Sequence, residues 1–195
     1  MLVTDRQETR GRDLVDVVEA AVVGGVGLVQ VRERELPEAE VEVLLRRILD
    51  RLDGMPVRVL VNSYPALARR LAIGLHLPAS APPPAPPRPS LLGRAVHDGS
   101  EARQALAESA SYVVVGPVFP TGSKLGHPGA GLETLAGLTR MVAPLPVFAI
   151  GGLTPERVPL VREAGAHGVA VRSVILGAPD PARAARAFAE VLHAV

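Results

Sequence analysis

The chain lacks cysteine and tryptophan, and its 195 residues include only two tyrosines and three phenylalanines. Without cysteine it can form no disulfide, offer no thiolate nucleophile and bind no zinc through sulfur. So few aromatic rings provide no platform on which single-stranded bases could stack. Basic residues number 21 and acidic residues 20, with no long run of either sign. We therefore expect no nucleic-acid partner.

Long apolar runs are absent as well. The first ten residues, MLVTDRQETR, contain no apolar stretch of the kind found in secretion signals, and no later apolar run could span a bilayer. We therefore expect a cytoplasmic protein with no membrane partner. An apolar content of 48% at this length is enough for a substantial core, so the sequence predicts one globular domain over residues 1–195.

Short apolar segments alternate with longer helical patterns along the whole chain. The segments predicted as strands are Leu2–Thr4, Gly27–Arg32, Val57–Asn62, Gly74–Leu77, Leu91–Val96, Tyr112–Val118, Pro146–Ile150 and Gly168–Arg172. The segments predicted as helices are Asp13–Val23, Pro37–Leu52, Pro65–Leu71, Ser100–Glu108, Leu132–Met141, Pro155–Ala164 and Pro181–Ala194. Parallel crossovers throughout predict an α/β fold, a compact (β/α)8 TIM barrel, in preference to an open doubly wound sheet.

One crossover carries no helical pattern. Pro78–Ser90 reads PASAPPPAPPRPS, with seven prolines in thirteen residues, and cannot be helical. We expect helix 4 of the barrel to be replaced by this proline-rich loop, lying extended on the surface. A proline-rich recognition ligand is the alternative.

The ends of the last two strands predict a phosphate site. PVFAIGG and GVAVRS each run from apolar residues into small or polar ones, about twenty residues apart. In (β/α)8 barrels the loops after the seventh and eighth strands often bind phosphate. Gly151 and Gly152 let an anion approach the backbone closely, and Ser173 adds a hydroxyl. This pattern indicates an enzyme acting on a phosphorylated small molecule.

Polar residues also occupy one phase of the second strand. Val29 and Val31 suit the helix-facing side, so Gln30 and Arg32 should point into the barrel, with Arg34 at its mouth. A guanidinium there is costly to bury unless it meets a ligand or a carboxylate. Ligand binding is our preferred interpretation, and an internal salt bridge to Glu33 or Glu35 is the alternative.

Further candidates follow the third and sixth strands. Asn62 ends a strand on the same side, although it could equally cap a helix, since Ser63 and Pro65 follow it. The glycine- and proline-rich loop after the sixth strand forms a possible anion cradle. Its candidate residues are Thr121, Ser123, Lys124 and His127.

Histidines are the candidate general acids and bases. His97 ends the fifth strand on the expected catalytic side, and His127 lies in a loop that could close over a substrate. His76 could be either a packed strand residue or a catalyst. His167 and His193 are predicted to lie on the surface, and no spacing typical of metal ligands is present.

Seven motifs in order resemble one family, the thiamin phosphate synthase/TenI superfamily, over essentially the whole chain. They are VQVRER, VLVNS, GLHLPAS, GRAVH, GPVFPTGSK, AIGGLTPERV and GVAVRS. The resemblance implies a (β/α)8 barrel and a small phosphorylated thiazole substrate. It also implies roles for individual residues. Gln30, Arg32, Arg34, Asn62 and Lys124 would contact a pyrimidine pyrophosphate, and Thr121, Ser123, Gly152 and Ser173 would hold a thiazole phosphate.

This chain departs from the synthase pattern at the positions of the metal ligands. The synthases bind Mg²⁺ through two aspartates; here one position is Ser63 and the other falls in the proline-rich segment, which has no carboxylate. Ala95 replaces a serine of the fifth strand. Without carboxylates the leaving pyrophosphate loses stabilisation worth several kcal/mol. We therefore expect a TenI-like thiazole tautomerase that needs no cofactor, with Mg²⁺ required only if the protein is a synthase.

The tautomerase would bind its substrate through a phosphate anchor and a carboxylate clamp and would need a proton shuttle. In TenI-like tautomerases the shuttling histidine stands where this chain has Pro117. Either another group moves the proton, for which His97, His127 and Lys124 are the candidate catalytic residues, or the chemistry differs. A thiamin phosphate synthase and a catalytically silent ligand-binding or regulatory homologue are the alternatives. The resemblance also suggests a homodimer.

Overall fold

A computed structural model describes residues 1–122, 126 and 128–194. It contains one sheet of eight parallel strands, each hydrogen-bonded to the next in chain order. The strands are β1 (Leu2–Val3), β2 (Leu28–Val31), β3 (Arg58–Asn62), β4 (Gly74–Leu77), β5 (Leu92–Val96), β6 (Tyr112–Val115), β7 (Val147–Ile150) and β8 (Gly168–Ala170).

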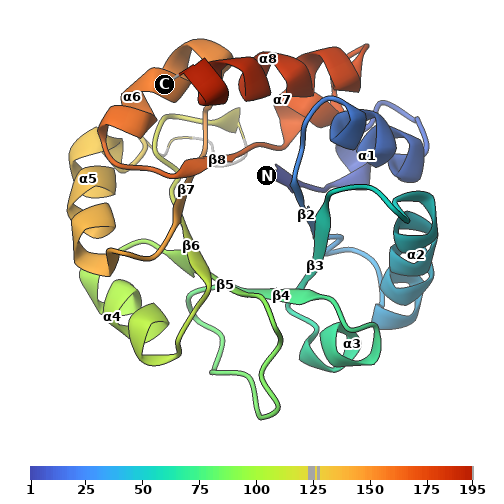
Figure 1. Cartoon of the computed structure of the whole chain (residues 1–195), viewed down its shortest axis with the longest axis horizontal. Helices are drawn as coiled ribbons and strands as arrows, with labels where there is room; N and C mark the ends of the chain where they lie inside the picture. The colour runs from blue at the N-terminus through green and yellow to red at the C-terminus, as the bar shows by residue number, and fades with distance from the viewer. Residues whose placement is uncertain (123–125, 127, 195) are drawn as a thin grey trace.

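The sheet closes on itself, as the ring of strands in Figure 1 shows. A parallel bridge pairs Leu2 with Val171, directly after β8. The Val3 amide donates to the Val171 carbonyl at 2.9 Å, and the Val171 amide donates to the Met1 carbonyl at 3.0 Å. The first strand therefore neighbours both β2 and the end of β8, which gives the (β/α)8 arrangement that the sequence predicted.

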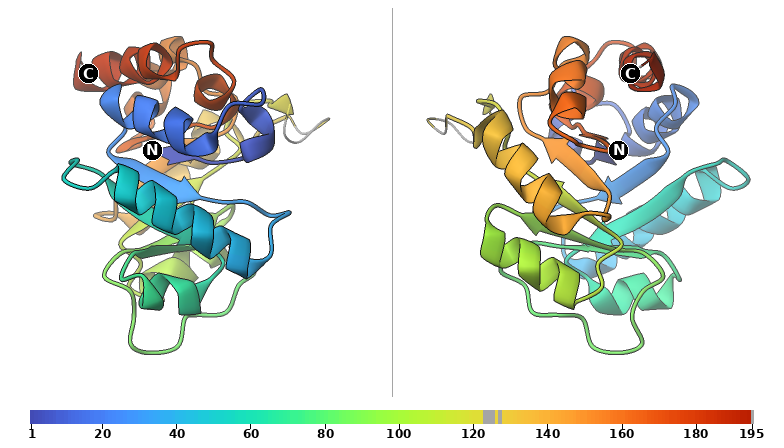
Figure 2. Two further views of the ribbon diagram at one scale, coloured as in Figure 1. Left: turned by 90° about the vertical axis from the view of Figure 1, so that its right-hand side faces the viewer. Right: turned by 60° about the vertical axis from the view of Figure 1, so that its left-hand side comes forward.

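Helices surround the ring on its outer side (Figures 1 and 2). They are α1 (Leu14–Val23), α2 (Glu38–Arg51), α3 (Pro65–Arg70), α4 (Gly99–Ala107), α5 (Gly131–Val142), α6 (Val158–Glu163), α7 (Ser173–Leu176) and α8 (Pro181–Ala194), with 3-10 turns η1 (Arg6–Glu8) and η3 (Pro155–Arg157). Asp13 caps α1 by accepting from the Val15 amide, and Asp98 caps α4 by accepting from two amides.

Two apolar layers follow from strand alternation. Val29 and Val31 pack with the inward faces of α1 and α2 in the larger layer, between sheet and helices. Leu60, Tyr112 and Val114 belong to a smaller cluster inside the ring. The helix-facing phase predicted for β2 is thus confirmed.

Residues 78–91 connect β4 to β5 and contain no helix. The loop extends outward from the ring in Figure 1. The fully buried Arg94 of β5 holds its first residues, donating to the carbonyls of Pro78 at 3.0 Å and Ala81 at 2.8 Å. The same guanidinium pairs with Glu108 at 3.0 Å, so the loop is connected to the end of α4.

Some predicted boundaries were wrong. The sixth strand ends at Val115 rather than Val118, because Pro117 has no amide hydrogen for the ladder. The helix predicted over Pro155–Ala164 is a 3-10 turn followed by α6. The eighth strand ends at Ala170, and α7, which no pattern predicted, begins at Ser173. No helix in the described part of the chain is long and apolar enough to cross a membrane.

Candidate active site

The strands are parallel, so their carboxyl ends meet at one mouth of the barrel, where (β/α)8 enzymes place their active sites. Gln30 faces the interior of that mouth and is buried. Its amide nitrogen donates to Asn62 Oδ1 at 3.0 Å, and Asn62 Nδ2 donates to the Ser63 hydroxyl at 2.8 Å. The cap residue of α3 is Tyr64, so Asn62 is not a helix cap. Its side chain belongs to the mouth.

Arg32 lies directly beyond β2 in the same phase as Gln30 and is half-buried. Burial lowers the pKa of its guanidinium, and the nearby positive charges of Arg34 and Arg172 lower it further. Among the described residues Arg32 has no ion-pair or hydrogen-bond partner for its guanidinium. Arg34 is exposed beside it. Within the described residues, no carboxylate therefore pairs directly with Arg32 or Arg34 at the mouth.

The salt bridge weighed against ligand binding is not formed, because both carboxylates have other partners. Glu33 is buried and accepts from the Thr4 hydroxyl and from the Arg6 amide. Burial raises the pKa of Glu33. Glu35 pairs with the Arg6 side chain at 2.7 Å. The Thr4 hydroxyl also accepts from the Arg32 amide at 2.9 Å, which fixes the backbone at the end of β2.

Arg172, which follows β8, is paired. Its guanidinium contacts Asp5 at 3.4 Å and Glu8 at 2.8 Å. These carboxylates come from the segment after β1, so the ion pairs join the beginning of the barrel to its last strand. Arg172 therefore differs from Arg32 in having protein carboxylates as partners.

The predicted phosphate rim is held in place by the segment after β6. Gly151 and Gly152 have positive φ angles of 98° and 63°. A Cβ on Gly151 would lie 2.5 Å from Pro117 Cβ, and one on Gly152 would lie 2.4 Å from the Pro120 carbonyl oxygen. Only glycine satisfies both the conformation and the contact. Ser173, at the start of α7, is exposed.

Arg157 also contacts this rim. It donates to the Gly152 carbonyl at 2.5 Å and stacks over the Phe119 ring at 4.7 Å. Thr121 is half-buried in the segment that follows. Ser123, Lys124 and His127 lie outside the described residues, so their predicted roles stay predictions.

His97 follows β5 and contacts a carboxylate of α4. It is exposed, and its Nδ1 lies 2.9 Å from Glu101, one turn into α4. The His97 amide also donates to the same carboxylate at 2.6 Å. The strand-end position predicted from sequence is correct, but the acidic residue four positions later engages the ring.

The resemblance predicts two positions for Mg²⁺ ligands, and the residues at those positions do not suit this ion. Ser63 supplies a hydroxyl in place of a carboxylate, and residues 63–91 contain no Asp or Glu. Within the described ranges, no group of three or more His, Cys, Asp or Glu side chains is placed to hold a metal ion. Hard divalent cations need several oxygen ligands, and carboxylates supply most of the charge.

A cavity of about 550 Å³ lies away from these residues, among η1, α1 and α2. Its arginines are already engaged: Arg6 with Glu35, and Arg47 with Asp13 at 2.6 Å. Arg12 donates to the Leu176 carbonyl at 2.7 Å. None of the predicted site residues lines this cavity. We place the site at the barrel mouth.

The fold and the mouth define a class, a (β/α)8 barrel with arginines and hydrogen-bonded amides at the carboxyl ends of its strands. The sequence profile of the family described as thiamine monophosphate synthase matches residues 1–175. The chain belongs to this family.

Similar proteins cover nearly the whole chain. A putative thiamine-phosphate synthase of Geobacter sulfurreducens is 39% identical over 199 residues, covering 98% of this chain and 92% of its own length. A thiamine-phosphate synthase of Syntrophomonas wolfei is 38% identical, with 97% and 94% covered. The structure of a thiamine phosphate pyrophosphorylase from Pyrococcus furiosus superposes with a TM-score of 0.86 at 26% identity, covering 99% of this chain and 94% of that one.

Proposed function

We propose that this protein acts in thiamine biosynthesis as a thiamine-phosphate synthase, joining a pyrimidine pyrophosphate to a thiazole phosphate. In this reaction the carbon–oxygen bond to the pyrophosphate breaks, a bond forms between that carbon and the thiazole nitrogen, and pyrophosphate leaves. The observation that carries the proposal is the half-buried Arg32, which has no ion-pair partner among the described residues and lies near the hydrogen-bonded Gln30 and Asn62. The reaction named for relatives 38–39% identical supports it.

Each part of the site has a role in this proposal. Arg32 and Arg34 meet the pyrophosphate, and their charge stabilises it as it leaves, because guanidinium forks match phosphate oxygens. Gly151, Gly152 and Ser173 hold the thiazole phosphate, together with Thr121. The two ligands then approach each other across the barrel mouth.

No step is assigned to Mg²⁺, because the residues at the two expected ligand positions do not suit it. The synthase should therefore form product in the presence of a chelator at a rate close to that without it. Product formation from the two substrates, with and without EDTA and then with added Mg²⁺, measures this. Activity that EDTA abolishes and Mg²⁺ restores would show that the metal is bound by other groups.

A second candidate is the metal-free thiazole tautomerase, which the missing carboxylates favour. Its proton shuttle would have to be a group other than residue 117, which is proline. Incubation with the carboxylated thiazole phosphate tautomer, followed by its absorbance change on aromatisation, tests this candidate. Turnover of the tautomer without condensation of the two synthase substrates would replace our proposal with the tautomerase. Turnover in neither assay would favour a silent homologue.

A further inference from the structure

A hydrogen-bonded network at the ends of β1 and β2 holds the backbone of Arg32. The Thr4 amide donates to the Gln30 carbonyl at 2.9 Å, which extends the pairing of these neighbouring strands by one residue (Figure 1). At the next step the Arg32 amide donates to the side-chain hydroxyl of Thr4, also at 2.9 Å. A threonine side chain therefore takes the place of a main-chain acceptor where β2 ends.

The hydroxyl of Thr4 is fixed by two partners. The residue is 0% exposed. Its Oγ1 donates to Glu33 Oε1 at 2.5 Å, a length typical of a hydroxyl bound to a carboxylate. The oxygen accepts from Arg32 while its hydrogen goes to Glu33, so the hydroxyl cannot rotate without losing one of the two bonds.

Glu33 completes the network. It is 3% exposed, and its second oxygen accepts from the Arg6 amide at 2.8 Å. Both carboxylate oxygens thus face a donor, and this arrangement needs the ionised form, because a carboxyl hydrogen would meet one of the donors. Burial raises the pKa of Glu33, and the hydrogen bonds from Thr4 and Arg6 oppose that effect. The buried charge is therefore retained through these two bonds.

The guanidinium of Arg32 has no comparable support. In the part of the chain that the structure describes, it has no ion-pair or hydrogen-bond partner. The charges of Arg34 and Arg172 oppose its own, and with burial they lower its pKa. Its place before a ligand arrives thus depends on the Arg32 backbone, whose amide is held by Thr4. A displacement of about 1 Å in a group that positions a substrate can cost on the order of a hundredfold in rate.

We propose that Thr4 and Glu33 are positioning residues for the anionic part of the substrate and act through Arg32. The Thr4 hydroxyl holds the Arg32 amide, and the Glu33 carboxylate orients that hydroxyl, so the guanidinium meets the pyrophosphate without rearrangement. Glu33 is in the opposite phase of the strand from Arg32 and is linked to it through Thr4. This inference rests on the proposed function and adds two residues that do not touch the ligand.

Charge and position predict opposite effects for one substitution. Glu33→Gln removes a negative charge near Arg32, and electrostatics alone predicts tighter binding of an anion. Glutamine also has an amide nitrogen, which cannot accept a hydrogen bond from either Thr4 or Arg6. The network then loses a bond, so a positioning role predicts weaker binding.

Isothermal titration calorimetry of the full chain with inorganic pyrophosphate tests the proposal. Thr4→Val keeps the side-chain shape without the hydroxyl and should lower affinity by about fivefold or more, because the Arg32 amide loses its acceptor. Thr4→Ser keeps the hydroxyl and should stay within about twofold of the wild type. Glu33→Gln should bind more weakly than the wild type. The matched control is Thr139→Val, whose hydroxyl bonds to Leu135 within α5, and its affinity should not change.

A measurement on the wild type covers the case in which Thr4→Val does not fold. Amide hydrogen exchange, followed by NMR, should show the Arg32 amide already protected without a ligand and equally protected with pyrophosphate. Protection that appears only with pyrophosphate would show that the network is not formed in advance, and it would overturn the proposal.

The condensation assay separates this inference from the function on which it rests. Thr4→Val should raise KM for the pyrimidine pyrophosphate and leave KM for the thiazole phosphate unchanged, whereas a general loss of structure would raise both. Unchanged pyrophosphate affinity in Thr4→Val, no rescue in Thr4→Ser, or tighter binding in Glu33→Gln would overturn the inference and leave the synthase intact. Pyrophosphate binding that depends on Thr4, without any condensation product, would instead refute the synthase and keep the positioning role.

Discussion

At the scale of single residues, strand alternation decides which polar side chains can face a ligand. The direction of the β2 side chains could be predicted because Val29 and Val31 must face the helices. This leaves Gln30 and Arg32 to face the barrel interior. The sequence could not exclude a salt bridge for Arg32, since Glu33 and Glu35 are adjacent. Only the structure shows that Thr4 and Arg6 engage those carboxylates.

Truncating Arg32 tests whether its guanidinium binds an anionic ligand. Arg32→Ala should weaken binding of pyrophosphate by about 1.5–3 kcal/mol, because it removes a charge-assisted contact. Folding stability should change little, since the guanidinium has no ion-pair or hydrogen-bond partner to lose in the part of the chain that the structure describes. Titration calorimetry and urea unfolding measure the two effects.

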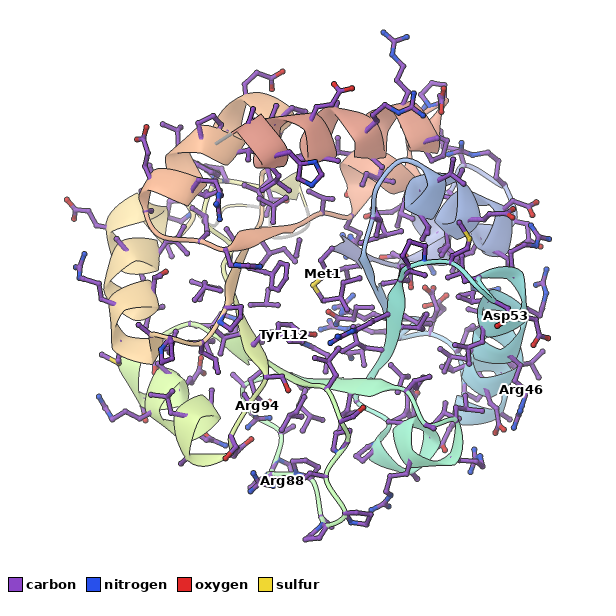
Figure 3. The ribbon with its side chains drawn as sticks, viewed as in Figure 1. Met1, Arg46, Asp53, Arg88, Arg94 and Tyr112 are labelled. Atoms are coloured by element: carbon purple, nitrogen blue, oxygen red, sulfur yellow. The ribbon has the colours of Figure 1, made fainter. Side chains whose placement is uncertain are left out.

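Arg46→Ala is the matched control. Arg46 pairs with Glu42 on the outer face of α2 and lies far from the mouth in Figure 3. It should leave ligand affinity unchanged. Unfolding of Arg32→Ala with full affinity in the folded fraction would instead make Arg32 a structural residue.

The sequence could not predict that the Tyr112 hydroxyl of β6 lies 3.2 Å from His76 Nδ1 of β4. The two residues are 36 positions apart and on strands that are not neighbours. Their contact depends on the missing side chain of Gly93, and a lone glycine in a strand can have several causes. The absence of a side chain is informative only once the register of three strands is known.

At the scale of elements, the segment between β4 and β5 is held by a buried ion pair rather than by a helix. Arg94 is 2% exposed and joins the carbonyls of Pro78 and Ala81 to Glu108. Gln104 donates to the same carboxylate at 2.7 Å, and Arg88 donates to the Glu108 carbonyl. Proline composition predicted a non-helical segment, but it could not indicate which side chain would attach it to the barrel.

Breaking the buried Arg94–Glu108 ion pair should greatly lower the free energy of unfolding. Arg94→Met leaves the Glu108 carboxylate buried without its cation and frees two loop carbonyls, so urea unfolding should show a loss of about 3–5 kcal/mol. The double variant Arg94→Met/Glu108→Leu removes both charges and should lose less than the single variant. If the double variant loses as much or more, the pair is not the main source of the effect.

At the scale of the whole molecule, the order of strands and the barrel were predictable because each crossover repeats one pattern. Alternation of apolar segments with amphipathic helices leaves few topologies for parallel strands. The short elements were not predictable. The four-residue α7 and the turn η1 have no apolar period of their own, and they are set by tertiary contacts such as the ion pairs of Arg172 with Asp5 and Glu8.

Burial of His76 in the barrel should make the stability of the whole protein depend on acid. Its pKa falls from 6.5 to about 3 on folding, mainly through burial. Between these values the unfolded chain binds more protons than the folded one, so the free energy of unfolding decreases as pH falls. The slope from this residue approaches about 1.4 kcal/mol per pH unit below pH 6.5.

Replacing His76 separates its contribution to this pH dependence from the contributions of the other titrating groups. His76→Gln cannot take up a proton, so its stability, measured by urea unfolding, should depend less on pH than the wild type's between pH 6.5 and 4. His193→Gln, at an exposed position, should keep the wild-type slope. Parallel curves for the wild type and His76→Gln would mean that the folded barrel admits a charged imidazole.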